Sequence, residues 1–158
     1  KPYQGKSKIK RHTINEQELI DMLKATPRVN LTVVEFGALS FKSQVEHAAH
    51  TDILIGIHGA GLTHTLFQPK RGILIELWDR SRPTRFHKLS IWSGHFYFRW
   101  HSPKKQKEDQ GVMVDLKEVR DLVQHTMTML ESNFTVFPPI FPECPVGVCF
   151  HAKPTIKK

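Results

Sequence analysis

The sequence is short of cysteine and of long apolar runs. It holds two cysteines among 158 residues, and no apolar stretch reaches the roughly 18 to 20 residues that a membrane-spanning helix requires. Cys144 and Cys149 are separated by Pro-Val-Gly-Val, which can turn the chain back far enough for a disulfide. A zinc site is not expected, because no second pair of ligands stands at metal-binding spacing. We therefore expect no membrane contact and no bound metal in this chain.

Several catalytic motifs are also absent. The sequence has no G-x-S-x-G nucleophile elbow, no Walker loop, no G-x-G-x-x-G turn and no D-x-D acidic pair. These absences argue against a serine hydrolase, a P-loop ATPase, a dinucleotide dehydrogenase and chelation of a metal-nucleotide by two aspartates.

Positive charge is what the chain has in excess. The net charge is +8, and much of it lies in two clusters, Lys1–Arg11 and Arg99–Lys107. Such clusters attract phosphates, including those of nucleotides and nucleic acids, although many are simply solvated. A nucleic-acid-binding module is not favoured, because the aromatic residues occupy core-like positions and do not form a stacking platform beside the lysines. These are Phe86, Trp92, Phe96, Phe98 and Trp100.

The apolar pattern alternates between strands and helices. Strands are predicted at 31–36, 52–57, 72–77 and 95–100, and helices at 14–26, 40–50, 62–68, 84–92 and 114–132. Asn15 and Glu18 have the spacing of a capping box at the first helix. This order predicts an α/β fold, a Rossmann-like parallel sheet with helices on both faces. We expect residues 1–137 to form this domain, followed by a proline-rich tail at 138–158.

The turn after the second predicted strand is the strongest candidate for a ligand site. His58, Gly59, Ala60 and Gly61 follow an apolar strand, and the next residues open a helix. Glycines let a ligand approach the backbone, and the free amides at a helix start favour a phosphate. The candidate diphosphate-binding residues are His58, Gly59, Ala60, Gly61, Leu62 and Thr63. The glycines could instead serve only a tight connection, and His64 could simply pack.

Glu76 is a second candidate because it closes an apolar strand. It could hold a ribose hydroxyl, as acids at strand ends do in dinucleotide sites, or it could cap the next helix. The HGAG turn also resembles the HGGG oxyanion turn of esterases, but no nucleophile elbow accompanies it.

Two sequons and the cysteine pair bear on localisation. Asn30-Leu31-Thr32 and Asn133-Phe134-Thr135 match the N-glycosylation pattern. Together with a disulfide, they favour the secretory pathway, in the endoplasmic reticulum lumen or the Golgi.

The chain resembles glycosyltransferase family 61. The resemblance rests on TDILIGIHGAGLTHTLFQP followed by ILIEL, and it is supported by RHTINEQELI, LSFKSQ and GHFYFRW. It implies a GT-B-type enzyme of which this chain is the C-terminal, donor-binding half. It also implies that Arg11 and His58 contact the donor diphosphate. Positive charge would then stabilise the departing UDP.

The implied reaction is inverting transfer of a sugar from a UDP-sugar to a protein Ser or Thr hydroxyl. The most similar family members point to UDP-GlcNAc as donor and EGF-like repeats as acceptor, with no required cofactor. No catalytic base is assigned, because the resemblance implies an N-terminal domain that is missing here. The stretch before Arg11 carries lysines where relatives have a second arginine, and lysine lacks the bidentate fork. We expect this chain alone to bind UDP weakly without turnover; the alternative is a non-catalytic relative that binds a nucleotide or a partner.

Overall fold

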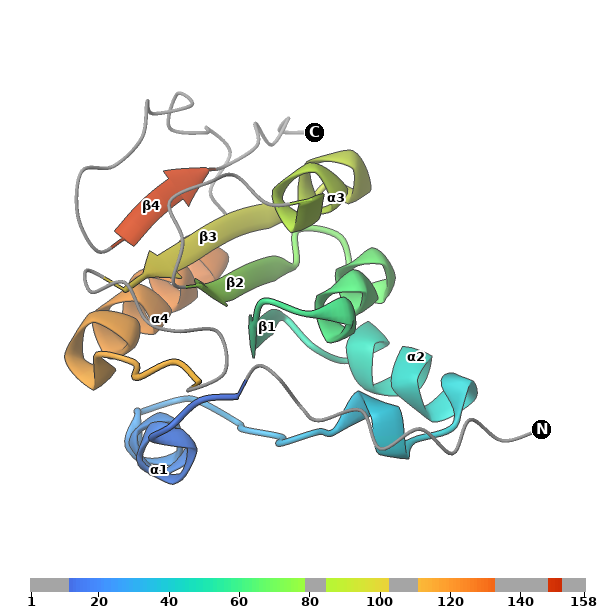
Figure 1. The fold of residues 1–158 in the computed structure, drawn as a ribbon. Helices are drawn as coiled ribbons and strands as arrows, with labels where there is room; N and C mark the ends of the chain where they lie inside the picture. Colours follow the sequence, from blue (N-terminus) through green and yellow to red (C-terminus); the bar gives the residue numbers. More distant parts are fainter. Residues whose placement is uncertain (1–11, 79–84, 103–110, 133–147, 152–158) are drawn as a thin grey trace.

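A computed structural model describes residues 12–78, 85–102, 111–132 and 148–151 of the chain, the last of these by their backbone (Figure 1). Helices and strands alternate through most of this range. In chain order they are α1 (Glu16–Ala25), the 3₁₀ helix η1 (Phe36–Ala38), α2 (Phe41–Ala49), β1 (Ile53–Ile57), the 3₁₀ helix η2 (Ala60–Phe67), β2 (Ile73–Trp78), α3 (Arg85–Ser93), β3 (Phe96–His101), α4 (Leu116–Glu131) and β4 (Val148–His151).

The strands form one sheet in the order β1-β2-β3-β4. The first three strands are parallel, and β4 pairs with β3 in the antiparallel direction. The register places Gly56, Glu76 and Arg99 in one row across the three parallel strands. Because side chains alternate along a strand, these three positions face the same side of the sheet.

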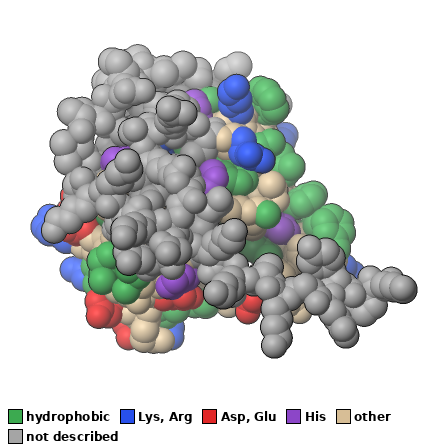
Figure 2. Space-filling model, in the orientation of Figure 1, with side chains coloured by type: hydrophobic (Ala, Val, Ile, Leu, Met, Phe, Trp, Pro, Cys, Tyr) green, Lys and Arg blue, Asp and Glu red, His purple; other side chains and the backbone are tan. Residues whose placement is uncertain are grey.

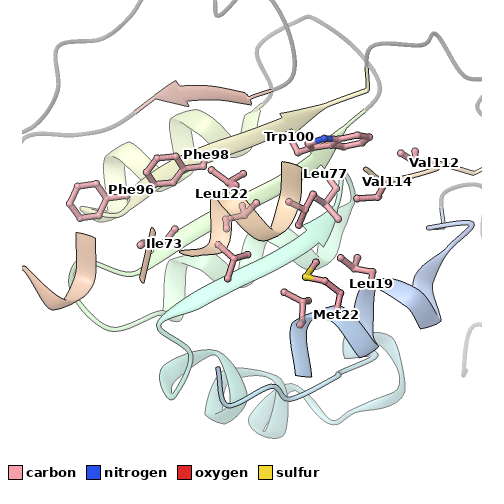
Figure 3. Packing of buried hydrophobic residues seen from close by; sticks show 14 of the residues in the cluster. Leu19, Met22, Ile73, Leu77, Phe96, Phe98, Trp100, Val112, Val114 and Leu122 are labelled. Atoms are coloured by element: carbon pink, nitrogen blue, oxygen red, sulfur yellow. The ribbon is translucent and has the colours of Figure 1, made fainter. Parts of the chain in front are cut away.

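Helices cover both faces of the sheet, as the sequence predicts (Figure 1). One face packs on α1 and α4 and carries the larger core (Figure 3). The other face packs on η2 and α3 and carries a smaller cluster around Leu62, Leu74, Phe86 and Tyr97. The predicted α/β fold with a parallel sheet is therefore confirmed.

Alternation within the strands explains how both faces become apolar. In β2, the odd-numbered residues Ile73, Ile75 and Leu77 join the larger core, while Leu74 joins the smaller cluster. A parallel strand covered on both sides must be apolar at successive positions. Glu76 is the exception, a carboxylate among the buried residues 73–77.

Two sequence-based expectations about local structure are wrong. Residues 31–35 form no strand, although their β-branched side chains favour one. Strand preference reflects packing on a half-buried pleated surface, whereas Val33 is 58% exposed. The short helix predicted after the HGAG turn is present, as the 3₁₀ helix η2. Trp92 is 76% exposed and not part of the core, unlike the other aromatic residues in that prediction.

The predicted capping box at α1 is wrong as well. Asn15 is the residue before α1, but its side chain makes no cap hydrogen bond. Instead Asn15 Nδ2 donates to the Val114 carbonyl at 2.9 Å, and the Val114 amide donates to Asn15 Oδ1 at 3.0 Å. A partner 99 positions away in sequence competes with the local cap and ties the start of α1 to the segment before α4.

Replacement of Asn15 separates these two roles. Asn15→Ala should lower the free energy of unfolding by about 1 to 3 kcal/mol, because two buried backbone groups lose their partner. Asn15→Ser can still cap the helix but cannot bridge both groups of Val114, so it should remain destabilised. Urea denaturation measures both variants. Full recovery by Asn15→Ser would show that capping, and not the bridge, is what matters.

No helix in the described ranges is both long enough and apolar enough to cross a bilayer.

Candidate functional site

The candidate site begins where β1 ends. Its ladder with β2 extends one residue past the strand, because the His58 amide donates to the Leu77 carbonyl at 3.0 Å. This bond fixes the backbone of His58 at the carboxyl edge of the sheet. Since β1, β2 and β3 are parallel, their carboxyl ends share that edge, which is where open α/β sheets bind ligands.

The start of η2 is held tightly against β1. A Cβ on Gly56 would lie 2.8 Å from Leu62 Cδ2, so only glycine leaves room for this leucine in its present position. Leu62 is 3% exposed, and its amide donates to the Gly59 carbonyl at 3.0 Å. The turn from β1 into η2 is therefore rigidly placed.

Gly59 and Gly61 differ from Gly56, because the protein leaves room at both. Among the described residues, a Cβ on Gly59 would meet only the Ile57 carbonyl oxygen, at 3.7 Å, and one on Gly61 only Phe36 Cδ2, at 3.6 Å. Both are ordinary contacts, and the extended φ of Gly59, 179°, is open to any residue. Packing within the described part of the chain thus does not account for these two glycines, which favours close approach by a ligand.

His58 and Glu76 form the most polar feature near this turn. Glu76 is completely buried, and its Oε1 contacts His58 Nδ1 while Tyr97 Oη donates to its Oε2. The His58 ring also packs edge-to-face on Phe86, with ring centroids 5.1 Å apart. The His58 side chain is 15% exposed, so it links the buried carboxylate to the surface.

His64 has a structural role. Its ring stacks on Phe36 with centroids 4.1 Å apart, and its Nδ1 and Nε2 contact the Gly61 carbonyl and Gln44 Oε1 at 2.9 and 2.8 Å. The interpretation that His64 packs is confirmed. On the face drawn in Figure 2, histidines lie among hydrophobic and basic side chains, so histidine alone does not mark the site.

The structure brings some predicted residues together and leaves others outside its described ranges. His58 and the residues from Gly59 to Thr63 form one turn, with Glu76 directly beneath His58. Asn30 is exposed in an irregular segment, as glycosylation requires. Arg11, Asn133 and Cys144 lie outside the described residues, and Cys149 is placed only by its backbone in β4. In the described ranges, no three His, Cys, Asp or Glu residues gather as a metal site.

Tyr97 is a member of the site that the sequence analysis did not select. It lies in an aromatic strand, yet its hydroxyl binds Glu76. A signal was present, since a buried tyrosine usually needs a hydrogen-bond partner and Glu76 is the one acid in the adjacent apolar strand.

Comparison with known proteins gives a consistent result. The family model described as Glycosyltransferase 61 matches residues 4–75. The EGF domain-specific O-linked N-acetylglucosamine transferase of Drosophila melanogaster is 38% identical over 90 residues, which are 57% of this chain and 17% of that protein. The rat and mouse proteins of the same name are 35% identical over 129 residues, 80% of this chain and 24% of each relative.

The matched region spans at most about a quarter of the length of these relatives. The segment that matches the family includes β1, the HGAG turn and the start of β2. The resemblance of this chain to glycosyltransferase family 61, predicted from the HGAGLTH segment and its flanks, is thereby confirmed.

Proposed function

We propose that this chain is the donor-binding part of an inverting glycosyltransferase of GT-B type, which uses a UDP-sugar. The observation that carries the proposal is the HGAG turn at the carboxyl edge of the parallel sheet. In this turn, Gly59 and Gly61 leave space beside the backbone, and His58 contacts the buried carboxylate of Glu76. A diphosphate is the ligand class that best suits such a turn.

The amides of the turn supply hydrogen-bond donors for the diphosphate. In η2, the first i to i+3 bond runs from the Leu62 amide to the Gly59 carbonyl. The Ala60 and Gly61 amides precede this bond, so helix geometry gives them no intrahelical acceptor. The room beside Gly59 and Gly61 lets phosphate oxygens reach the backbone. Thr63 is less suited than its neighbours to bind phosphate through its hydroxyl, which donates to the Ala60 carbonyl at 2.6 Å.

His58 adds charge to this arrangement. A protonated imidazole donates a charge-assisted hydrogen bond to a phosphate oxygen, and such bonds strengthen as the diphosphate gains charge on leaving. Arg11 is proposed as a second cation. Metal-free departure of UDP requires positive charge of this kind, so the proposal includes no metal and no cofactor besides the donor.

The donor and acceptor follow from the relatives. We propose UDP-GlcNAc as donor and a Ser or Thr hydroxyl of EGF-like repeats as acceptor, because the similar proteins are named for EGF domain-specific, O-linked transfer of N-acetylglucosamine. Acceptor contacts and the catalytic base are assigned to the part of the relatives that this chain does not match. The exposed Asn30 sequon and these relatives also favour the secretory pathway.

Titration of UDP into the chain tests the proposal, with ADP as the control, at two salt concentrations. We expect saturable binding that prefers UDP and persists at the higher salt. Equal binding of both nucleotides that falls steeply with salt would indicate only a basic surface and would contradict the proposal.

Replacement of Gly59 by alanine should separate ligand binding from folding. The added Cβ meets no atom of the described residues closer than 3.7 Å, so Gly59→Ala should change the free energy of unfolding by less than about 0.5 kcal/mol. It should nevertheless weaken UDP binding, because the methyl group occupies the space proposed for the diphosphate. Calorimetric titration and urea denaturation measure the two effects.

Gly72→Ala is the opposite control. Its Cβ would lie 2.8 Å from Gln68 Cβ and 3.1 Å from the Pro69 carbonyl oxygen, so Gly72→Ala should destabilise the fold.

Unaltered UDP affinity in Gly59→Ala would count against close approach of the donor to the HGAG turn.

A further inference from the structure

We infer that Glu76, supported by Tyr97, is a positioning residue that fixes the tautomer and the ring orientation of His58. The inference deepens the proposed function and rests on it for the identity of the ligand. The sequence suggests that Glu76 binds a ribose hydroxyl, and that prediction stays untested. Here we assign Glu76 a contact with His58 instead.

The burial of Glu76 makes a structural explanation necessary. A carboxylate that is 0% exposed carries a large desolvation penalty unless hydrogen bonds and opposite charge compensate it. Both oxygens are engaged, Oε1 by His58 Nδ1 and Oε2 by the Tyr97 hydroxyl. Arg99, a buried cation, occupies the adjacent position in the β3 register on the same sheet face. Two hydrogen bonds and a cation at the neighbouring register position thus suit a carboxylate in this buried place.

This contact decides which nitrogen of His58 holds a proton. An ionised carboxylate only accepts hydrogen bonds, so Nδ1 must carry hydrogen when it binds Glu76. Nε2 is the other ring nitrogen, and in the proposed complex it contacts the phosphate. A phosphate oxygen also accepts, so the donor-bound state requires hydrogen on Nε2 too, which makes the ring an imidazolium between two anions.

Three contacts together restrict the ring. Glu76 fixes the Nδ1 side, Phe86 packs against the ring at a 68° interplanar angle, and the His58 backbone is bonded to Leu77. An orienting carboxylate behind a functional histidine has the same effect in metal sites and in catalytic triads. Here it orients the His58 ring so that Nε2, once the ring is protonated, donates to the diphosphate.

Tyr97 acts one step further from the ligand. Its hydroxyl binds Oε2, which leaves Oε1 directed at His58. Tyr97 comes from β3, Glu76 from β2 and His58 from the end of β1, so the relay crosses three neighbouring strands. The parallel register, and not a loop, sets its geometry.

Nitrogen NMR of the histidine rings in the ligand-free 158-residue chain tests the inference directly. In the wild type, His58 should show Nδ1 protonated and one dominant tautomer where the ring is neutral. Glu76→Gln keeps the shape of the side chain but removes its charge, and it should shift His58 toward the Nε2–H form or a mixture. Tyr97→Phe should produce a smaller shift in the same direction.

UDP titration supplies the functional readout. Glu76→Gln should weaken UDP binding about 10-fold, in line with the 10- to 100-fold effect of orienting partners in metal sites. Glu46→Gln is the matched control, because Glu46 is exposed and pairs only loosely with Lys42 at 3.7 Å; it should leave both readouts unchanged. A wild-type His58 ring that carries its proton on Nε2 and not on Nδ1 would overturn the inference. An unaltered His58 spectrum in Glu76→Gln would overturn it as well.

The two readouts separate the inference from the proposed function. If the His58 tautomer changes in Glu76→Gln while the wild-type chain binds no UDP, the positioning role of Glu76 is supported and donor binding by this chain is contradicted. If UDP binds selectively but the His58 tautomer is the same in Glu76→Gln as in the wild type, the donor site is supported and the positioning role of Glu76 is wrong. Should Glu76→Gln fail to fold, Tyr97→Phe carries the same NMR comparison with a milder change.

Discussion

Trp100→Ala should lower the free energy of unfolding by about 3 to 5 kcal/mol, the usual range for truncation of a buried tryptophan. Trp100 is 1% exposed within the larger core, between the sheet and α4 (Figure 3). Its Nε1 also donates to Glu118 Oε2 at 2.7 Å, so the substitution removes a bond between β3 and α4 together with the packing. Small domains have a total stability of about 5 to 15 kcal/mol, so this variant should be close to unfolding.

Trp92→Ala is the matched control. It removes the same side chain from α3, where the indole is 76% exposed, and should change stability by less than about 0.5 kcal/mol. Urea denaturation of both variants, with midpoints and slopes compared, measures the difference. Equal losses would contradict the placement of β3 between the two helical layers.

His58→Ala should have the largest effect on nucleotide binding. The lost bond joins two charged groups, and such bonds typically contribute about 1.5 to 3 kcal/mol, which corresponds to roughly 10- to 150-fold in affinity. The substitution also removes a partner from buried Glu76, so its stability must be measured beside its affinity.

His47→Ala controls for the loss of an imidazole. His47 is exposed in α2, away from the HGAG turn in sequence, and should leave UDP affinity unchanged. An equal loss of affinity in the two variants would show that histidine charge, and not the position of His58, matters.

The sequence predicts most of the sheet and helices for a clear physical reason. The strands predicted at 52–57 and 72–77 are apolar at nearly all successive positions, a pattern expected where helices cover both faces of a parallel sheet. The stripe of α4 likewise marks the face that packs on the sheet, with Val119, Leu122 and Val123 buried as expected. Local pattern and tertiary packing agree in these elements.

Prediction from the local sequence pattern fails where a partner far away in sequence, or a lack of burial, determines the structure. Residues 31–35 have strand-forming side chains without the half-buried surface that such side chains need. Asn15 has capping chemistry but binds Val114. Trp92 is apolar but has no core to join. None of these outcomes can be read from neighbouring residues in sequence.

The candidate site was predictable in part. The HGAG turn is visible because its glycines interrupt an apolar strand, and the structure adds that packing does not require them at Gly59 and Gly61. The roles of Glu76 and Tyr97 depend on strand register, which brings residues from three strands together and which a single sequence does not specify.

The most direct test of the central claim is to map UDP onto the backbone amides of the chain by NMR. The account predicts that UDP shifts the amides from His58 to Thr63 and leaves exposed amides of α4 unmoved. Shifts confined to the basic 104–107 segment, or spread evenly over the surface, would contradict the assignment of this turn as the donor diphosphate site.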